Sequence, residues 1–261
     1  MDLLKQALKI KTDGLFLCVL GPSGAGKSHF IGTYPGRVLF LHGAGEAHGA
    51  ASAVKSNSDV ISVSWSQSPE GPVESRLIPK RVREILEPEV IKAAGIKCVA
   101  IDSLTNLALD FKETEAFKQR CAGKGGVHNS FKESEALIEM LSRVINQLQV
   151  LSDQHDIDVI VTMDLQINQV AADGTILESK PGLPTFGVGK AIVQQFADIL
   201  VLGRIESQPM FQNKAHVASK SVNRDTQEVV KYIEYNPRLR GVKELPELIQ
   251  PTVAAIMELK K

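Results

Sequence analysis

The sequence contains no hydrophobic run long enough to cross a membrane. None of its apolar stretches approaches the roughly 18–20 residues that a membrane-spanning helix needs. The N-terminal segment MDLLKQALKIKTDG interleaves acidic and basic side chains and lacks a small-residue cleavage site, so it does not resemble a signal peptide. These absences argue against an integral membrane protein and predict a cytoplasmic location with no membrane partner.

Net charge is absent as well. Thirty Lys and Arg residues balance thirty Asp and Glu residues over 261 positions. This balance excludes a protein that binds nucleic acid through its overall charge, so any contact with DNA must use a local basic patch. Hydrophobic residues make up 43% and charged residues 23% of the chain, which is enough to bury a core and excludes wholesale disorder.

Repeats, low-complexity linkers and metal-binding cysteine patterns are also missing. The three cysteines, Cys18, Cys98 and Cys121, form no CxxC pair and no histidine-spaced pattern. We therefore expect buried, reduced thiols. Because no linker marks a boundary, we predict a single domain over residues 1–261.

What the sequence does contain is an alternation of short apolar runs with helix-length segments. Such an alternation predicts an α/β fold with a mostly parallel central sheet flanked by helices. The first run is apolar at every position, which is typical of a central strand covered on both faces. The predicted strands are Leu15–Leu20, Val38–His42, Val60–Trp65, Cys98–Ile101, Val159–Met163 and Ile199–Leu202.

Helices are indicated by the spacing of apolar residues. Residues 130–154 open with Ser130 and Glu133 in a capping-box pattern, and apolar residues then recur every three or four positions. Residues 104–119 form a second predicted helix. Residues 73–95 are helical in composition, but Pro79 and Pro88 interrupt them.

The pattern changes after residue 205. Val217 and the run Val229–Ile233, set among polar residues, predict two or three antiparallel strands. Pro246 is expected to open a last helix, whose apolar residues are Leu248, Ile249, Val253, Ile256 and Leu259. We thus divide the predicted domain into an N-terminal helix (1–13), a core (14–205) and C-terminal strands with a helix (206–261).

The strongest motif is a glycine-rich loop directly after the first strand. It matches G-x-x-x-x-G-K-[ST] at every fixed position. Its glycines let backbone N–H groups surround a phosphate, and the helix that starts near Lys27 directs its positive end at the same anion. Lys27 reaches the β- and γ-phosphates, and Ser28 offers its hydroxyl to Mg²⁺. The predicted nucleotide-binding residues are Gly21, Pro22, Ser23, Gly24, Ala25, Gly26, Lys27, Ser28 and His29.

Two acidic residues are candidates for the remaining chemistry. Asp102 ends an apolar strand, and P-loop enzymes need such an aspartate near the loop serine to hold Mg²⁺. Glu46 follows the second strand and is either the group that activates the attacking water or a solvated loop acid. His42 and His48 flank Glu46 and are expected to be surface or packing residues. The predicted catalytic residues are Lys27, Glu46 and Asp102, and the predicted metal ligands are Ser28 and Asp102.

Four segments resemble the RecA-like ATPase core: GPSGAGKSHFIGTYP, VLFLHGAGE, VAIDSLTNL and IDVIVTMD. The similarity runs from about residue 14 to residue 245 and is greatest to small phage-encoded nucleotide-binding or single-strand annealing recombinase proteins. It implies that the strand starting at Asp158 inserts between the strand before the loop and the strand with Asp102. It also implies that ATP and Mg²⁺ are the ligands and that Glu46 activates the water.

The resemblance further implies partners. Protomers would stack head to tail, so that each ATP lies at a subunit interface and a basic residue of the neighbour touches the γ-phosphate. Arg238 and Arg240 are the candidates for that residue, with a solvated turn as the alternative. Single-stranded DNA would face two loops, which follow the strands ending at Asp102 and Met163, and a single-strand-binding protein is a further candidate partner.

Three features depart from the family's pattern. The strand ending at Met163 usually finishes in a Gln or His that senses the γ-phosphate, but here Asp164 occupies that place and Gln166 is shifted by two. The second strand usually ends in Asp shortly before the Glu, but here it ends in His42 with a longer Gly-Ala-Gly spacer. The late basic motif usually pairs Lys and Arg before a Gly, but residues 236–241 are NPRLRG.

A local basic segment is the candidate for contact with DNA. Residues 112–132 contain five basic and two acidic residues, a local charge of 5 − 2 = +3. Cations with interleaved aromatic side chains are typical of sequence-tolerant single-strand binding, although the phenylalanines also suit helix cores. The residues concerned are Lys112, Lys118, Arg120, Lys124 and Lys132, with Phe111, Phe117 and Phe131. A second loop, about residues 165–190, is less basic because Asp173 and Glu178 accompany Lys180, Phe186 and Lys190.

Three functions follow from these patterns. The first is a RecA-like, DNA-stimulated ATPase that acts on single strands in annealing or recombination. The second is a small-molecule kinase, which needs several arginines converging on the phosphates, whereas only Arg120 lies in the mid-chain loop. The third is a nucleotide-gated binding or packaging module for a protein partner.

Overall fold

A computed structural model describes most of the chain. The described residues are 14–122, 129–170, 172, 176–185, 188–213, 216–222, 229–235 and 237–261. The predicted helix over residues 1–13 lies outside them, as do Lys124, Asp173 and Phe186 of the two candidate DNA loops.

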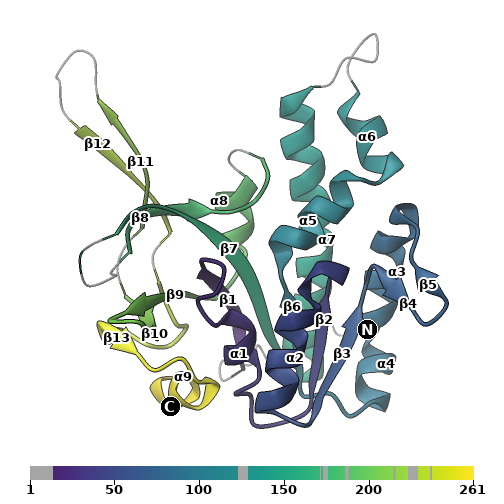
Figure 1. The fold of residues 1–261 in the computed structure, drawn as a ribbon, viewed down its shortest axis with the longest axis horizontal. Coiled ribbons are helices and arrows are strands. Elements are labelled where there is room, and N and C mark those ends of the chain that lie inside the picture. The colour runs from purple at the N-terminus through teal and green to yellow at the C-terminus, as the bar shows by residue number, and fades with distance from the viewer. Residues whose placement is uncertain are drawn as a thin grey trace, which may run out of the picture.

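The described strands form an α/β fold around a mixed, mostly parallel sheet (Figure 1). Six central strands are all parallel and lie in the order β3-β2-β6-β7-β1-β9. Their bounds are β1 Phe16–Gly21, β2 Val38–His42, β3 Val60–Ser64, β6 Cys98–Asp102, β7 Asp158–Val170 and β9 Asp198–Ile205. The sequence therefore predicted each of these strands to within one residue at its start.

The burial and the order of the central strands bring the candidate site residues to one edge of the sheet. Every residue of β1, β2 and β6 is buried, because helices cover both faces of these strands. Strand β7 lies between β1 and β6, which confirms the insertion that the resemblance implied. In this register Gly21 pairs with Asp164, and His42 pairs with Asp102. The carboxyl ends of β1, β2, β6 and β7 thus meet along one edge of the sheet.

Antiparallel strands extend the sheet beyond β9 and beside the C-terminal part of β7. Beside β9 lie β10 (Gln208–Gln212) and β13 (Leu248–Ile249). Strand β7 continues beyond the predicted Met163 to Val170 and pairs with β8 (Ile176–Pro181). The predicted loop over about residues 165–190 is therefore wrong where β7 extends to Val170 and where β8 forms. Gln166, Ile167 and Asn168 are all exposed, so no buried apolar run marks this extension in the sequence. Beyond β8, β11 (His216–Val222) and β12 (Val229–Tyr235) form an antiparallel pair that extends away from the body (Figure 1).

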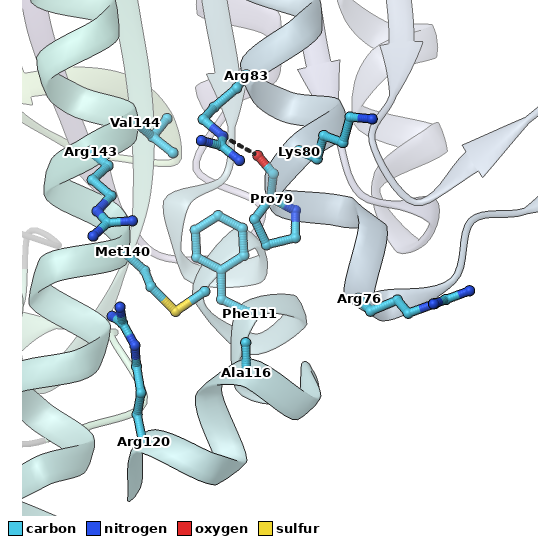
Figure 2. Close-up of a pocket in the computed structure, with 10 residues that line it drawn as sticks. All are labelled: Arg76, Pro79, Lys80, Arg83, Phe111, Ala116, Arg120, Met140, Arg143 and Val144. Atoms are coloured by element: carbon cyan, nitrogen blue, oxygen red, sulfur yellow. Dashed lines mark hydrogen bonds between the residues drawn. The ribbon is translucent and has the colours of Figure 1, made fainter.

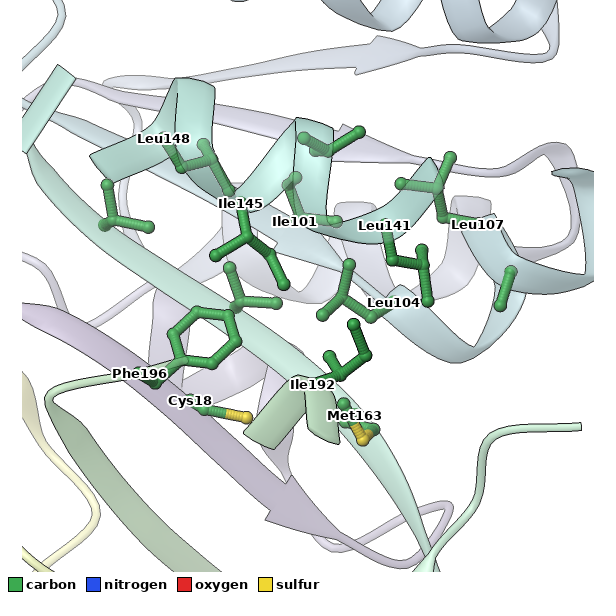
Figure 3. Close-up of a cluster of buried hydrophobic side chains, with 14 of the residues drawn as sticks. Cys18, Ile101, Leu104, Leu107, Leu141, Ile145, Leu148, Met163, Ile192 and Phe196 are labelled. Atoms are coloured by element: carbon green, nitrogen blue, oxygen red, sulfur yellow. The ribbon is translucent and has the colours of Figure 1, made fainter. Parts of the chain in front are cut away.

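Helices cover the two faces of the sheet and enclose two apolar clusters. One cluster includes residues of α1 (Lys27–Ile31), α2 (Ala47–Ser56) and α9 (Val253–Leu259). The other contains residues from α3 to α8, and Figure 3 shows Leu141, Ile145 and Leu148 among its members. The helices that contribute to it are α3 Ile78–Ile85, α4 Pro88–Ala93, α5 Leu104–Lys112, α6 Glu115–Cys121, α7 Ser130–His155 and α8 Val188–Val193. Two short 3₁₀ turns, η2 (Ala44–Glu46) and η3 (Ser75–Leu77), and a small hairpin of β4 (Gln67–Ser68) and β5 (Gly71–Pro72) complete the described elements.

The helix predictions need three corrections. The predicted capping box was wrong: helix α7 is capped by the Asn129 side chain, which accepts hydrogen bonds from the N–H groups of Phe131 and Lys132. Residues 104–119 form two helices, because Thr114 accepts from the Phe117 N–H and starts α6. Pro79 and Pro88 lie in the first turns of α3 and α4, where the missing proline N–H costs no helical hydrogen bond.

The last helix also begins later than predicted. Leu248 and Ile249 pair with β10, and α9 starts at Val253 after a Thr252 cap whose side chain accepts from the Ala255 N–H. Pro251 disfavours helical backbone at the residue before it, so the helix cannot extend back through Gln250.

Two other expectations concern the cysteines and the membrane-spanning helices. The three cysteines are free and buried, as the sequence predicted. No helix within the described ranges is both long and apolar enough to span a bilayer.

A buried ion pair ties the C-terminal helix to the start of the sheet. Asp198 and Lys260 are 0% and 3% exposed, and their charged atoms lie 2.9 Å apart. The Asp198 carboxylate also accepts from the backbone N–H groups of Phe16 and Arg240. The strands β1 and β9 and the helix α9 therefore share one buried charge cluster.

Lys260→Met is expected to lower the free energy of unfolding by about 3 kcal/mol, because it leaves the Asp198 charge buried without a counterion. Urea denaturation measures this loss. Lys261→Met is the matched control, since Lys261 is exposed, and it should change stability by less than about 0.5 kcal/mol. Equal effects of the two substitutions would contradict a special role for the pair.

Candidate nucleotide-binding site

The glycine-rich loop connects β1 to α1 at the carboxyl edge of the sheet. Gly24 and Gly26 have φ values of 76° and 102°, in the left-handed region that side chains with a Cβ rarely adopt. A Cβ on Gly21 would lie 2.7 Å from the Leu202 carbonyl oxygen on the adjacent strand β9. The fixed glycines of the motif therefore match positions where the backbone requires them.

A cleft of about 460 Å³ opens over this loop. Its volume falls within the range of small-molecule binding sites. The residues that line it come from the loop, from the η2–α2 segment, from the end of β6 and from the middle of β7: Ser23, Gly24, Gly26, Lys27, Ser28, His29, Gly45, Glu46, His48, Gly49, Ser52, Asp102 and Asp164. The structure thus brings Lys27, Ser28, Glu46 and Asp102 together, although they come from widely separated positions.

The remaining predicted loop residues lie beside or beneath the cleft. Pro22 and Ala25 line an adjoining pocket of about 550 Å³ together with Ile167 and Arg204. Gly21 is buried, and its carbonyl accepts a hydrogen bond from the Lys27 ammonium.

Lys27 is held by oxygens of its own loop and by one carboxylate. Its Nζ donates to the carbonyls of Gly21 and Pro22 at 2.9 and 3.1 Å and to Asp164 Oδ1 at 2.9 Å. Its side chain is 8% exposed, so the charge is fixed at the floor of the cleft. An anion that enters here meets a preplaced ammonium group and competes for it with Asp164.

Ser28 and Asp102 form an oxygen pair suited to Mg²⁺. Ser28 Oγ donates to Asp102 Oδ2 at 2.6 Å, while Thr162 donates to the other carboxylate oxygen and fixes its orientation. Gly49 of α2 faces this pair, and a Cβ there would lie 2.7 Å from Ser28 Oγ. The glycine therefore leaves room beside the two oxygens.

The donor set also fits the preference of this ion. Mg²⁺ is usually bound by one or two protein oxygens together with phosphates and waters. No group of three or more His, Cys, Asp or Glu side chains with metal-binding geometry occurs in the part of the chain that the structure describes. A shared Ser28–Asp102 site matches that preference.

Glu46 projects into the same cleft from η2 and is only half-buried. The Asn106 amide of α5 donates to its Oε1. Burial, followed by the charges of Asp102 and Asp164, raises the pKa of Glu46 to about 7, against a smaller opposing effect of Lys27. A carboxyl group with a pKa near neutrality can exchange a proton at physiological pH, as a general base requires.

The histidines near the loop and Trp65 differ in whether they line the cleft or pack inside the protein. His42 is buried and its ring nitrogens lie 2.7 Å from the Gly43 carbonyl and 2.9 Å from Ser62 Oγ. Trp65 is fully buried, and its indole N–H donates to Asp110. His48 is exposed but lines the cleft, and His29 lines it while its Nδ1 contacts Ser56.

Of the two candidate phosphate sensors, Asp164 lines the cleft, and Gln166 is exposed outside its lining. The Asp164 N–H donates to Thr105 of α5, and its carbonyl accepts from the Gly182 N–H after β8. Asp164 therefore connects Lys27 with α5 and with the β7–β8 pair.

Asp164→Asn is expected to raise the affinity for Mg·ATP about two- to fivefold. The amide no longer competes as an anion for Lys27, and a partly exposed ion pair is worth up to about 1 kcal/mol. Titration with a fluorescent ATP analogue measures the change, with Gln166→Ala as the control. A weaker affinity would show instead that Asp164 helps to hold the nucleotide.

Arg238 and Arg240 lie at the opposite edge of the sheet. The Arg238 guanidinium donates to the carbonyls of Phe196 and Ala197, and Arg240 donates to the Gly14 carbonyl. These acceptors precede β9 and β1, whereas the glycine-rich loop follows β1. Neither arginine belongs to the cleft of its own protomer, so their action on a neighbour stays a prediction.

The candidate DNA segment is only partly available as a surface. Phe111 and Phe117 are 1% and 2% exposed, so they belong to the core and cannot stack on bases, whereas Phe131 is 72% exposed. Lys112, Lys118 and Arg120 pair with the carboxylates of Glu133, Glu113 and Glu139. These pairs reduce the local positive charge that the sequence suggested.

Sequence reasoning missed several residues of the cleft. Gly49 and Ser52 lie on α2 one and two turns after Glu46, but nothing in the sequence showed that α2 covers the loop. Asn106 follows the acidic strand by four residues, and only the packing of α5 beside η2 brings it to Glu46. Thr162 resembles an ordinary strand residue until β7 is placed beside β6.

Comparison with known proteins adds no assignment. No protein-family model matches the chain, and no curated protein matches it. The function must therefore be argued from the geometry of the cleft.

Proposed function

We propose that this protein binds and hydrolyses ATP with Mg²⁺ as a RecA-like P-loop ATPase that acts on single-stranded DNA. The observation that carries the ATPase proposal is the convergence of Lys27, Ser28, Asp102 and Glu46 on one cleft. Phosphoryl transfer to water requires a loop that holds the phosphates, oxygen ligands for the metal ion and a group that orients or deprotonates the water, such as a carboxyl group with a near-neutral pKa.

Each group has a distinct task in this proposal. Backbone N–H groups of the loop and the Lys27 ammonium bind the β- and γ-phosphates. Ser28 and Asp102 would hold Mg²⁺, which neutralises charge that develops on the phosphates. Glu46 orients a water molecule and accepts its proton, while the Asn106 amide keeps the Glu46 carboxyl group directed into the cleft.

The strand order supports the RecA-like part of the proposal. The insertion of β7 between β1 and β6 is the arrangement that the sequence resemblance implied. The action on single-stranded DNA rests on that resemblance and on the exposed Phe131 beside the basic segment. Head-to-tail assembly, with Arg238 or Arg240 touching the neighbour's γ-phosphate, belongs to the same proposal.

The kinase alternative receives little support from the cleft. Among the described residues that line it there is no arginine, whereas phosphate transfer to a small acceptor needs arginines that converge on the phosphates. A module that uses ATP to control a protein partner is compatible with the same cleft and is distinguished by experiment.

The deciding experiment measures ATP hydrolysis by the purified chain with and without single-stranded DNA. We expect slow hydrolysis that DNA accelerates, together with retention of a labelled oligonucleotide at low salt. Hydrolysis that is indifferent to DNA, with no DNA retained, would leave the ATPase but remove the recombination role. Phosphate transfer to nucleosides in the absence of DNA would favour the kinase.

A further inference from the structure

A separate pocket lies between α3, α5, α6 and α7, and it shares no lining residue with the nucleotide cleft or with the pocket beside it (Figure 2). Its volume is about 220 Å³. Five lining residues are apolar, namely Pro79, Phe111, Ala116, Met140 and Val144, and five are cationic, namely Arg76, Lys80, Arg83, Arg120 and Arg143.

The floor of the pocket is apolar and suits one large side chain. Phe111 and Val144 are almost fully buried, and the half-buried Met140 lies beside Phe111 (Figure 2). A methionine adapts its shape to a partner more readily than a branched residue does. An apolar or aromatic side chain that enters this pocket gains contacts without leaving a buried polar group unpaired.

The rim carries more positive than negative charge. Arg120 and Arg143 share a single carboxylate, that of Glu139. Arg83 donates to the Pro79 carbonyl in its own helix, and no carboxylate of the described residues lies within ion-pair distance of it. Arg76 and Lys80 pair with Glu74 and Glu84, so five cations face three carboxylates.

We infer that this pocket binds an acidic peptide segment that carries a large apolar residue next to its carboxylates. The apolar residue fills the space above Phe111 and Met140, and the carboxylates meet the surplus guanidinium donors of Arg83, Arg120 and Arg143. Arginine binds carboxylates through two parallel hydrogen bonds, which gives such a site geometric selectivity.

The same features favour a peptide over a single strand of nucleic acid. The polar edges of a base would lose their hydrogen bonds against an apolar floor. The cations also surround one pocket, whereas a groove that follows a phosphate backbone carries them along its length. This inference does not depend on the proposed ATPase function, because the two sites have no residue in common.

The test is binding of a fluorescein-labelled synthetic peptide of aspartates that ends in phenylalanine, followed by fluorescence anisotropy. The full chain is expected to bind it with micromolar affinity, and the affinity should fall at least about tenfold in the Arg83→Glu/Arg143→Glu double variant. Ala116→Trp, which places a ring over the pocket without a charge change, should weaken binding to a similar extent.

Control variants and a control peptide distinguish binding in the pocket from an effect of the protein's overall charge. Lys55→Glu/Lys243→Glu makes the same change in net charge at exposed positions outside the pocket and should leave peptide affinity within about twofold. A peptide that ends in serine should bind at least about tenfold more weakly than the phenylalanine peptide. Far-UV circular dichroism and thermal unfolding should be the same for all variants and the parent chain, which shows that the variants are folded.

Three outcomes would overturn the inference. They are no peptide binding at low salt, equal losses in the pocket and control double variants, and loss of oligo(dT) affinity with no change in peptide affinity. The last outcome would assign the pocket to nucleic acid.

Discussion

Replacing Lys27 with methionine should weaken Mg·ATP binding by at least about thirtyfold and abolish detectable hydrolysis. The ammonium group lies at the floor of the cleft within reach of loop carbonyls, where a phosphate would make charge-assisted hydrogen bonds worth about 1.5–3 kcal/mol. Methionine keeps the length and apolar character of the side-chain stem and removes only the charge and the donors. Isothermal titration calorimetry with a non-hydrolysable analogue measures the loss.

The methionine variant also separates binding from folding. The Lys27 ammonium bonds to two loop carbonyls, so its removal must be checked by thermal unfolding. Lys55→Met on the exposed surface of α2 is the matched control and should leave affinity unchanged. If the Lys27→Met variant is folded and still binds ATP normally, the glycine-rich loop does not hold the triphosphate and the proposed function fails.

Glu46→Gln should lower kcat about 10²–10³-fold while ATP affinity stays within about threefold. The amide retains the size of the side chain and an oxygen that accepts from Asn106, but it cannot take a proton from water. Single-turnover hydrolysis measured with excess protein distinguishes the lost chemical step from lost binding. Glu244→Gln, at an exposed position, serves as the control.

The pH dependence provides an independent check on Glu46. Burial and the neighbouring Asp102 and Asp164 raise the pKa of Glu46 to about 7, so the carboxyl group is largely protonated below that pH and cannot act as a base. We expect kcat/KM, which reports the free protein, to rise as pH increases through about 7 and to level off above it. The Glu46→Gln variant should lack this limb. Normal hydrolysis by that variant would show that another group activates the water.

The local parts of the site could be predicted from the sequence because their chemistry is local. Of the two fixed glycines, Gly26 adopts left-handed backbone and Gly21 leaves no room for a Cβ, so the motif specifies the loop where it follows a buried strand. The apolar runs predicted the fully buried strands β1, β2 and β6 for a similar reason, since a strand covered on both faces must be apolar along its length. Asp102 was found because it ends such a strand.

The predictions from the sequence were wrong where two residues suit the same cap or where one segment suits both a helix and a strand. The side chain that caps α7 is Asn129, one residue before the predicted Ser130, and both residue types suit that position. Leu248 and Ile249 match a helical pattern equally well, yet they pair with β10, because an open strand edge there offers backbone hydrogen bonds. For Phe111 and Phe117 the sequence left two readings, a stacking surface or a helix core, and the packing of α5 and α6 confirms the core.

By itself, the sequence determined the glycine-rich loop, the parallel strands and the candidates Lys27, Ser28 and Asp102, because backbone geometry or burial imposes each of them within its own short segment. Only the tertiary structure decided that Glu46, Asn106, Gly49 and Asp164 meet at the cleft and that Gln166, Arg238 and Arg240 lie elsewhere. It alone formed the cationic pocket over Phe111, whose rim comes from η3, α3, α6 and α7. The physical reason is that these groups are brought together by sheet register and helix packing, which depend on contacts between residues far apart in the chain.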